Sequence, residues 1–465
     1  MPAPGRLLAL LLLAALPEPA AARAAAPDVP PARNVVLVVS DDQHWRDYGF
    51  MGHPRLRTPH LDRLARESLL YRRGYVPSSL CCPSLATLIT GRFPHEHRIV
   101  GNDPPGTDRP PRGSPEGRAR FAAGREAMNR HLAEWPLLPS LLAPAGVRSL
   151  QTGKWWQGDY SRGGFTEGMT RGERHGDDGL VIGRRTMEPI RDFVRGRAAA
   201  GERFLVWYAP MLPHDPHDPP EELVAHHAAF TPSIHVARYL GNVERFDRSV
   251  GELLDILDAE GVADDTLVVY VTDNGWIQDP DRPRYAPKSK RSPYDGGLRT
   301  PIMLRRPGAI PPGVCDTPVS SVDVVPTVLA ASGVPAPPGL PGVDLLDAGA
   351  VERRGVVFGE CHTHTLVDLD DPAAGLLWRY AVAGRWKLVV PEKLAADDPR
   401  LAVEGGALDD DSRAWLASGE PRLFDLESDP DENASVAADH PDVVARLSRA
   451  IDGWWTPSRS PHGAR

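Results

Sequence analysis

Two adjacent cysteines open the run CCPSLATLITG at residues 81–91, where the residue types are well suited to chemistry. Pro83 is tolerated in the first turn of a helix, because the amide hydrogen that it lacks would have no partner there. A helix that begins here places the thiols of Cys81 and Cys82 at its N-terminus, where the helix dipole favours anions and lowers a thiol pKa. The alternative is a buried cysteine pair at the start of a core helix, since free cysteine is among the most buried residue types.

Polar side chains follow four segments that are predicted to be buried strands. The strands and the residues after them are 34–39 with Asp41 and Asp42, 147–150 with Lys154, 203–208 with His214, and 266–271 with Asp273 and Asn274. Because ligands bind outside the carboxyl ends of strands in open α/β sheets, we expect these side chains to converge. Carboxylates, an amide, a lysine and a histidine together describe a metal-assisted site for a tetrahedral oxyanion. Each cluster taken alone is equally compatible with a solvated strand end.

Together with these clusters, the run at 81–91 resembles the signature of the sulfatase family, C-x-P-S-R followed by T-G, within the alkaline phosphatase-like superfamily. Cys81 then stands at the position that family members convert to formylglycine. The resemblance extends from about residue 33 to 435 and preserves the order of the motifs. Further matches are Gly153, Lys154 and Trp155 to G-K-W-H, Lys290 to the lysine before Y-E-G-G, Tyr294-Asp295-Gly296-Gly297 to that motif, and the run LFDLESDPDE.

The resemblance implies one calcium ion and a hydrolytic mechanism. The implied metal ligands are Asp41, Asp42, Cys81, Asp273 and Asn274. In the family, the hydrate of formylglycine attacks sulfur. Lys154 and Lys290 are expected to neutralise the sulfate oxygens, and His214 to stabilise or protonate the leaving oxygen. The implied catalytic residues are therefore Cys81, Lys154, His214 and Lys290, of which the last three also bind substrate.

Two positions depart from the family pattern. Leu85 stands where the signature has an arginine, which belongs both to the active site and to the motif read by the formylglycine-generating enzyme. Trp156 replaces the histidine of G-K-W-H, so that His217 or His175 would have to supply proton transfer in its place. The retained metal ligands and Lys290 argue against a decayed site.

Three functions are compatible with these residues. The leading one is an exported calcium-dependent sulfatase-like hydrolase that cleaves the sulfate ester of a small molecule or glycan, since the CCPS run resembles the glucosamine-6-sulfatase branch. Its partners would be that sulfated substrate and the formylglycine-generating enzyme. The second is a phosphate or phosphonate ester hydrolase on the same scaffold. The third is a catalytically inactive protein that binds sulfated glycans.

The N-terminus of this 465-residue chain has the pattern of a secretory signal at residues 1–26, with Arg6 before an apolar run at 7–16. We therefore expect a secreted or periplasmic protein, or a lysosomal one in a eukaryote, without stable membrane insertion. Export permits disulfides, and the sequence leaves a bridge between Cys315 and Cys361 open. The net charge of −9 gives no support to nucleic-acid binding.

The expected fold is α/β, with a large mostly parallel sheet flanked by helices. This catalytic domain is predicted over 27–372, followed by a small C-terminal α+β subdomain over 373–465. Predicted helices of the large domain are 59–71, 81–91, 137–145, 236–260 and 323–332, and further strands are 302–305 and 355–358. The subdomain is expected to hold an antiparallel sheet with one helix, formed by a hairpin at 378–390, a strand at 421–426 and a helix at 443–455.

Overall fold

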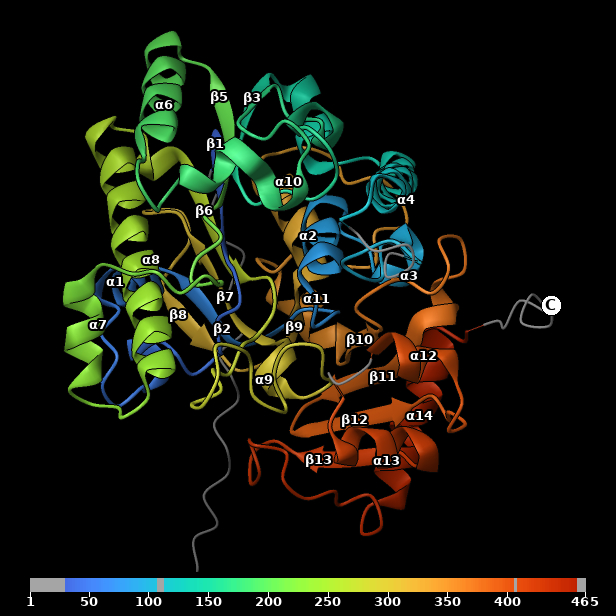
Figure 1. Ribbon diagram of the computed structural model, residues 1–465. Helices are drawn as coiled ribbons and strands as arrows, with labels where there is room; N and C mark the ends of the chain where they lie inside the picture. The colour runs from blue at the N-terminus through green and yellow to red at the C-terminus, as the bar shows by residue number, and fades with distance from the viewer. Residues whose placement is uncertain (1–29, 107–112, 405–407, 458–465) are drawn as a thin grey trace, which may run out of the picture.

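The computed structural model describes residues 30–106, 113–404 and 408–457, which form two sheets and the helices around them (Figure 1). The predicted signal segment 1–26 lies outside the described residues. Among the described residues, no helix combines the length and the apolar character needed to cross a membrane.

The large sheet has nine strands in the order β4-β3-β5-β1-β6-β7-β2-β8, with β9 paired to β2. The strands are β1 (Asn34–Ser40), β2 (Leu69–Tyr75), β3 (Val147–Gly153), β4 (Glu167–Gly168), β5 (Arg203–Ala209), β6 (Thr266–Thr272), β7 (Arg299–Arg305), β8 (Gly313–Cys315) and β9 (Val319–Ser320). The neighbours β3, β5, β1 and β6 run parallel, and β7 runs antiparallel to β6 and β2. The predicted mostly parallel sheet is confirmed, and the four strands that precede polar clusters are direct neighbours.

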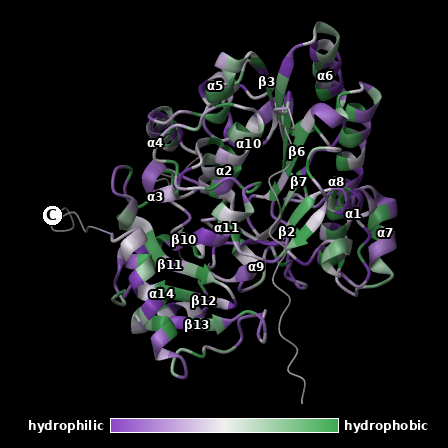
Figure 2. Ribbon diagram, turned by 180° about the vertical axis from the view of Figure 1, so that it is seen from behind, coloured by the Kyte–Doolittle hydropathy of each residue, from purple (hydrophilic) through white to green (hydrophobic). Residues whose placement is uncertain are grey.

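Helices cover both faces of this sheet. The helices of this part of the chain are α1 (Pro59–Arg66), α2 (Cys81–Thr90), α3 (Pro94–His97), α4 (Pro115–Ala133), α5 (Leu138–Leu142), α6 (Glu188–Ala200), α7 (Glu221–Ala228), α8 (Ile234–Ala259), α9 (Asp295–Leu298), α10 (Val324–Ala331) and α11 (Ala348–Arg354). Successive side chains of a strand point to opposite faces. Val36 and Val38 of β1 therefore join the core with α1, α6 and α8, whereas Leu37 and Val39 join the core with α2, α5 and α10. The central strands β6 and β7 are accordingly hydrophobic (Figure 2).

The helix predicted over 59–71 is wrong in its second half. Helix α1 ends at Arg66, and the residues after Ser68 form β2. Leu69 and Leu70 pair with Leu304 and Met303 of β7, more than 230 positions away in the chain. A short apolar run fits a helix and a strand equally well, so only this distant pairing decides the strand.

The C-terminal part of the chain forms a second, antiparallel sheet of four strands. They are β10 (Val357–His362), β11 (Leu376–Ala383), β12 (Trp386–Pro391) and β13 (Arg422–Asp425). The predicted helix is α14 (Pro441–Trp454), whose residues Val443, Leu447 and Ile451 pack on this sheet. Two shorter helices, α12 (Pro399–Glu404) and α13 (Asp410–Ser418), accompany it. Strand β10 precedes residue 373, and the domain boundary at that residue stays a prediction.

A buried ion cluster joins the small sheet to the large one. The Nζ of Lys387 on β12 lies 2.9 Å from an Asp295 carboxylate oxygen in α9 and 2.9 Å from a Glu432 carboxylate oxygen. The Lys387 side chain is fully buried. Burial by itself would lower the pKa of Lys387, but Asp295 and Glu432 hold it above its usual value, so the lysine stays charged.

All four cysteines lie within the described residues and all are free thiols. Cys315 belongs to β8 at the end of the large sheet, and Cys361 belongs to β10 of the small sheet. The Sγ of Cys361 lies 3.6 Å from the Oγ of Ser79. The Cys315–Cys361 bridge that the sequence left open is therefore not formed.

We expect Lys387→Met to lower the free energy of unfolding by about 3–5 kcal/mol, because it leaves two buried carboxylates without their cation. The measurement is a urea unfolding curve of the purified protein. Lys393→Met is the matched control, since Lys393 is exposed in the same part of the chain and its replacement should change stability by less than about 0.5 kcal/mol. Equal midpoints for the two variants would contradict a stabilising role for the cluster.

Candidate active site

The site lies at the carboxyl edge of the large sheet, where four parallel strands end side by side. Strand β1 pairs with β6 up to Ser40 opposite Thr272, and β3 pairs with β5 up to Gly153 opposite Ala209. The chain therefore leaves the sheet at one edge in all four places. The structure brings together every predicted site residue, namely Asp41, Asp42, Cys81, Lys154, His214, Asp273, Asn274 and Lys290.

Lys154 connects the aspartates that follow β1 and β6. Its Nζ donates a hydrogen bond of 2.7 Å to Oδ1 of Asp41 and one of 3.4 Å to Oδ2 of Asp273. Burial by itself would raise the pKa of Asp41, but the charges of Lys154 and His214 hold it below its usual value. Burial lowers and the Asp41 carboxylate raises the pKa of Lys154, which ends well above its ordinary value. Lys154 is thus a fixed cation inside the site.

Lys290 is the second cation, and it links a carboxylate to the cysteine. Its Nζ lies 2.7 Å from Oδ1 of Asp42, 2.8 Å from Oδ2 of the same residue, and 3.0 Å from Sγ of Cys81. The Nδ2 of Asn274 donates a 2.6 Å hydrogen bond to Oδ1 of Asp42. Asp42 has a φ of 59°, which non-glycine residues adopt rarely, and its own N–H donates to Oδ1 of Asp273.

Helix α2 begins at Cys81, as the sequence predicts, and the two cysteines have different surroundings. Burial raises the pKa of the Cys81 thiol, but Lys154 and Lys290 lower it to about 7. The Cys82 thiol accepts a 3.0 Å hydrogen bond from Nε2 of Gln157, and burial raises its pKa. Of the two, only Cys81 contacts the carboxylate and lysine network, so the structure distinguishes between adjacent residues of the same type.

Leu85 lies one helical turn after Cys81, on the same side of α2, and is fully buried. It belongs to the hydrophobic core that α2 forms with the sheet. An apolar side chain at this position contributes packing but no charge to the site. Lys154 and Lys290, the charges that lower the pKa of the Cys81 thiol, both lie outside α2.

His214 lies beside the Asp42 carboxylate. Its Nε2 lies 3.4 Å from Oδ2 of Asp42, and its Nδ1 lies 2.8 Å from Oδ1 of Asp215. Burial lowers the pKa of His214, but Asp41 and Asp42 raise it well above its ordinary value. Asp215 is a positioning residue that the sequence analysis missed. Its place directly after His214, in the loop that follows β5, was the signal that could have revealed it.

The two histidines considered as substitutes for Trp156 lie in different surroundings. The ring of His175 is 4.6 Å from that of Trp156 and 5.8 Å from that of His214, centroid to centroid. His217 instead packs its ring against Tyr239, at 5.4 Å. His175 is therefore the histidine beside the position of the missing family histidine, and burial together with Lys154 lowers its pKa.

The residues fit a hard divalent cation. Ligand atoms of Asp41, Asp42, Cys81 and His214 lie within 4.8 Å of one another, and Asp273 and Asn274 adjoin them. The Oδ1 of Asn274 is buried and has no hydrogen-bond partner among the described residues. Burial and the nearby Asp41 raise the pKa of Asp273 well above its usual value, which indicates a local excess of carboxylates. Oxygen donors with such an excess are what calcium prefers.

Taken together, the fold and the site are those of an ester hydrolase of the alkaline phosphatase-like superfamily. The family model described as Sulfatase matches residues 33–334. The chain belongs to the sulfatase family, and it is a sulfuric ester hydrolase.

Relatives and solved structures agree with this assignment. The chain is 29% identical to N-acetylgalactosamine-6-sulfatase of Canis lupus familiaris over 70% of this chain and 68% of the relative, and 28% identical to Arylsulfatase A of Homo sapiens over 90% and 86%. It shares its fold with Ps i-CgsB in complex with k-i-k-neocarrahexaose, at a TM-score of 0.68, 21% identity, and coverage of 92% and 94%. The structure of BT4656 with D-glucosamine-2-N,6-O-disulfate has a TM-score of 0.65 at 17% identity, covering 91% and 97%.

We expect Asp273→Asn to weaken calcium binding at least about tenfold, because it removes one carboxylate charge from the set while keeping the side-chain shape. The measurement is calcium titration by calorimetry, with the rise in Tm on calcium addition as a second readout. Asp255→Asn is the control, since the Asp255 side chain is 72% exposed and lies on the far end of α8. Equal calcium affinity of the Asp273 variant and the wild type would rule out this carboxylate as a ligand.

Proposed function

We propose that this protein is an exported, calcium-dependent sulfatase that hydrolyses the sulfate ester of a carbohydrate by means of formylglycine derived from Cys81. The observation that supports it most strongly is the position of the Cys81 sulfur, 3.0 Å from the Lys290 ammonium and beside the carboxylate cluster. This sulfur stands where the reactive oxygen of a formylglycine hydrate would be. Family membership supports the reaction class.

The two lysines bind the sulfate group in this proposal. Lys290 and Lys154 are buried and charged, and both influence the group at residue 81. Fixed cations in a site with little water stabilise the charge that develops on oxygens around sulfur. Asp41 and Asp42 hold the two ammonium groups in place, so the cations need little reorganisation during the reaction.

His214 donates the proton to the leaving oxygen. Its raised pKa keeps it protonated, and Asp215 fixes the ring through Nδ1 so that Nε2 faces the site. General-acid catalysis by a positioned histidine of this kind contributes to expulsion of an alcohol. His175, next to Trp156 and His214, is placed to orient the sugar oxygen.

Bound calcium would be held by Asp41, Asp42, Asp273 and Asn274, and it supplies Lewis-acid polarisation of oxygen. Formylglycine supplies a hydrate whose two hydroxyl groups allow attack and later release of sulfate, which a thiol cannot do. Leu85 in place of the signature arginine makes conversion of Cys81 the step that requires a direct test.

Carbohydrate is the proposed substrate class because the relatives named above include an N-acetylgalactosamine-6-sulfatase. The signal pattern at 1–26 supports export, and we retain a catalytic domain over 27–372 with a C-terminal subdomain over 373–465. A phosphonate ester is the second candidate substrate. Phosphonate monoester hydrolase SpPMH from Silicibacter pomeroyi shares the fold at a TM-score of 0.60 and 20% identity.

We expect Cys81 to carry an aldehyde in protein purified from its native host. Trypsin releases residues 74–92 as one peptide, because the cleavage sites are Arg73 and Arg92. Mass spectrometry of that peptide, with aldehyde capture by a hydrazide, places the modification at residue 81 or 82. Recovery of the peptide only as free thiols would exclude the formylglycine mechanism for this chain.

We expect Cys81→Ser to lower kcat/KM for 4-nitrophenyl sulfate by at least about 1000-fold, because it removes the precursor of the nucleophile. Cys82→Ser is the matched control, because the Cys82 thiol bonds to Gln157 rather than to the carboxylate and lysine cluster. This variant should retain most of the turnover. Assays with an aryl phosphonate run in parallel. Turnover of the phosphonate in preference to the sulfate would favour the second candidate, and turnover of neither would favour a binding protein.

A further inference from the structure

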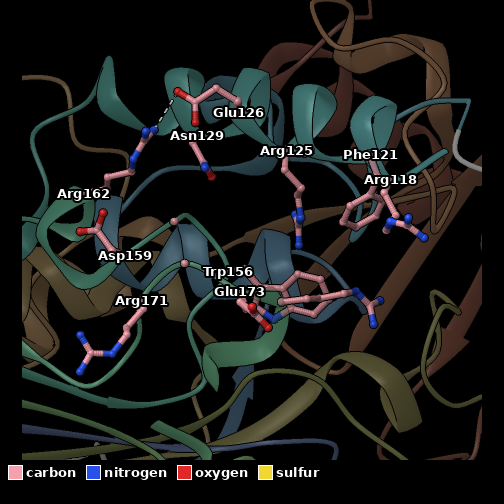
Figure 3. A pocket seen from close by; sticks show the side chains of 14 residues that line it. Arg118, Phe121, Arg125, Glu126, Asn129, Trp156, Asp159, Arg162, Arg171 and Glu173 are labelled. Carbon is pink, nitrogen blue, oxygen red and sulfur yellow. Dashed lines mark hydrogen bonds and ion pairs between the residues drawn. The ribbon is translucent and has the colours of Figure 1, made fainter. Parts of the chain in front are cut away.

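A basic pocket lies beside the carboxylate and lysine site, between helix α4 and the segment from Trp156 to Arg174 (Figure 3). Its volume is about 670 Å³, which is in the range of small-molecule and sugar sites. Five arginines and three carboxylate side chains line it, together with Phe121 and Trp156. The mechanism proposed above uses none of the arginines. We refer to this cavity as the arginine pocket.

Helix α4 supplies one wall of the arginine pocket through a single face. Arg118, Phe121, Arg125 and Asn129 are spaced three, four and four residues apart, which aligns them along one side of a helix. Arg125 points from α4 toward Trp156 in Figure 3. The sequence analysis did not predict this helix, although the spacing of these side chains was its signal.

Arg125 lines the arginine pocket without a counter-charge. Among the described residues it has no carboxylate partner, and its Nη1 contacts only the sulfurs of Cys82 at 3.8 Å and Met128 at 3.7 Å. Its Nη2 is buried and also has no hydrogen-bond partner among the residues that the structure describes. By contrast, Arg162 pairs with Glu126 at 2.9 Å. A half-buried guanidinium without an anion is unfavourable, which indicates that a ligand supplies one.

Trp156 connects the arginine pocket to the catalytic site. It is only 4% exposed, and its indole Nε1 is buried without a partner among the described residues. The Arg125 guanidinium lies 4.6 Å from the centroid of its ring and the Arg174 guanidinium 4.8 Å. On the catalytic side, Nζ of Lys154 lies 5.9 Å from the same ring. An unpaired indole donor and an unpaired guanidinium donor therefore line one cavity.

We propose that the arginine pocket binds a second anionic group of the substrate, a sulfate or a carboxylate, while the lysines hold the sulfate that is cleaved. Arg125 and the Trp156 Nε1–H donate hydrogen bonds to its oxygens, and Arg174 adds a further positive charge. Planar guanidinium groups suit oxyanions of both kinds. The enzyme accordingly selects polyanionic sugars over sugars with a single sulfate. Only the statement that the lysines hold a sulfate that is cleaved rests on the proposed function.

The test compares Arg125→Met with wild type in calorimetric binding, using the Cys81→Ser background so that no turnover occurs. The probes are N-acetylgalactosamine-6-sulfate, D-glucosamine-2-N,6-O-disulfate and a chondroitin 6-sulfate disaccharide with its uronate carboxylate. We expect the affinity of Arg125→Met for at least one doubly charged probe to fall about tenfold or more, because a charge-assisted hydrogen bond is lost. The affinity of the variant for the singly charged probe should fall much less. The disulfate and uronate arms show whether sulfate or carboxylate is the second group.

Arg130→Met is the matched control, because Arg130 is exposed on α4 and does not line the pocket. Arg174→Met is the second variant, since its side chain is 37% exposed and its replacement should leave folding intact even if Arg125→Met unfolds. Its affinity for doubly charged probes should fall in the same direction.

Equal affinity of wild type, Arg125→Met and Arg174→Met for both doubly charged probes would overturn the proposal. In enzyme that retains Cys81, Arg125→Met should lower the ratio of kcat/KM for a doubly charged sulfate ester to that for a singly charged one about tenfold. Charge-selective binding without turnover of any sulfate ester would sustain the arginine pocket and contradict the proposed function. Failure of the arginine-pocket proposal and failure of the proposed function are therefore distinguishable.

Discussion

Three carboxylates, two ammonium groups, a histidine and a thiol lie together, buried at the edge of the large sheet. The relative exposure of Asp41, Asp42, Asp273 and Lys154 is at most 2%. Such charges are stable together only when each has an opposite charge or a hydrogen bond at close range. Lys154 and Lys290 meet this requirement for the aspartates, and the carboxylates in turn keep both lysines charged. The chemistry proposed for Cys81 depends on this mutual compensation.

Contacts with the C-terminal part of the chain hold the loop that carries Lys290. Lys288, two residues before Lys290, donates hydrogen bonds of 3.1 and 2.8 Å to the carbonyl oxygens of Asp431 and Glu432. Glu432 in turn pairs with Lys387, which also binds Asp295. The loop that carries Lys290 is thus held at both ends by the C-terminal part of the chain. The second sheet therefore positions Lys290, although among the described residues it adds no side chain to the carboxylate and lysine cluster.

The two departures from the family signature have different physical consequences. Leu85 replaces a charge by packing, so the positive charge near residue 81 comes from the two lysines. Trp156 replaces a proton carrier by a large aromatic surface, on which guanidinium groups of Arg125 and Arg174 rest. Leu85 leaves the proposed oxyanion site with one charged side chain fewer than the family pattern. Trp156 connects that site to the arginine pocket. In this respect the altered positions shape the site rather than abolish it.

The sequence by itself determined the parallel strands, the polar residues that follow them, and the start of α2 at Cys81, because each depends on a local pattern. Buried apolar runs, a proline in a first helical turn and side chains next to strand ends are visible in a few neighbouring residues. Only the tertiary structure decided that 69–75 is a strand, since its partner is β7. It also decided that Cys315 and Cys361 stay apart and that His175, rather than His217, adjoins Trp156. The arginine pocket likewise needs α4 to pack near the segment after β3. These features rest on contacts between residues distant in the chain, which no local pattern records.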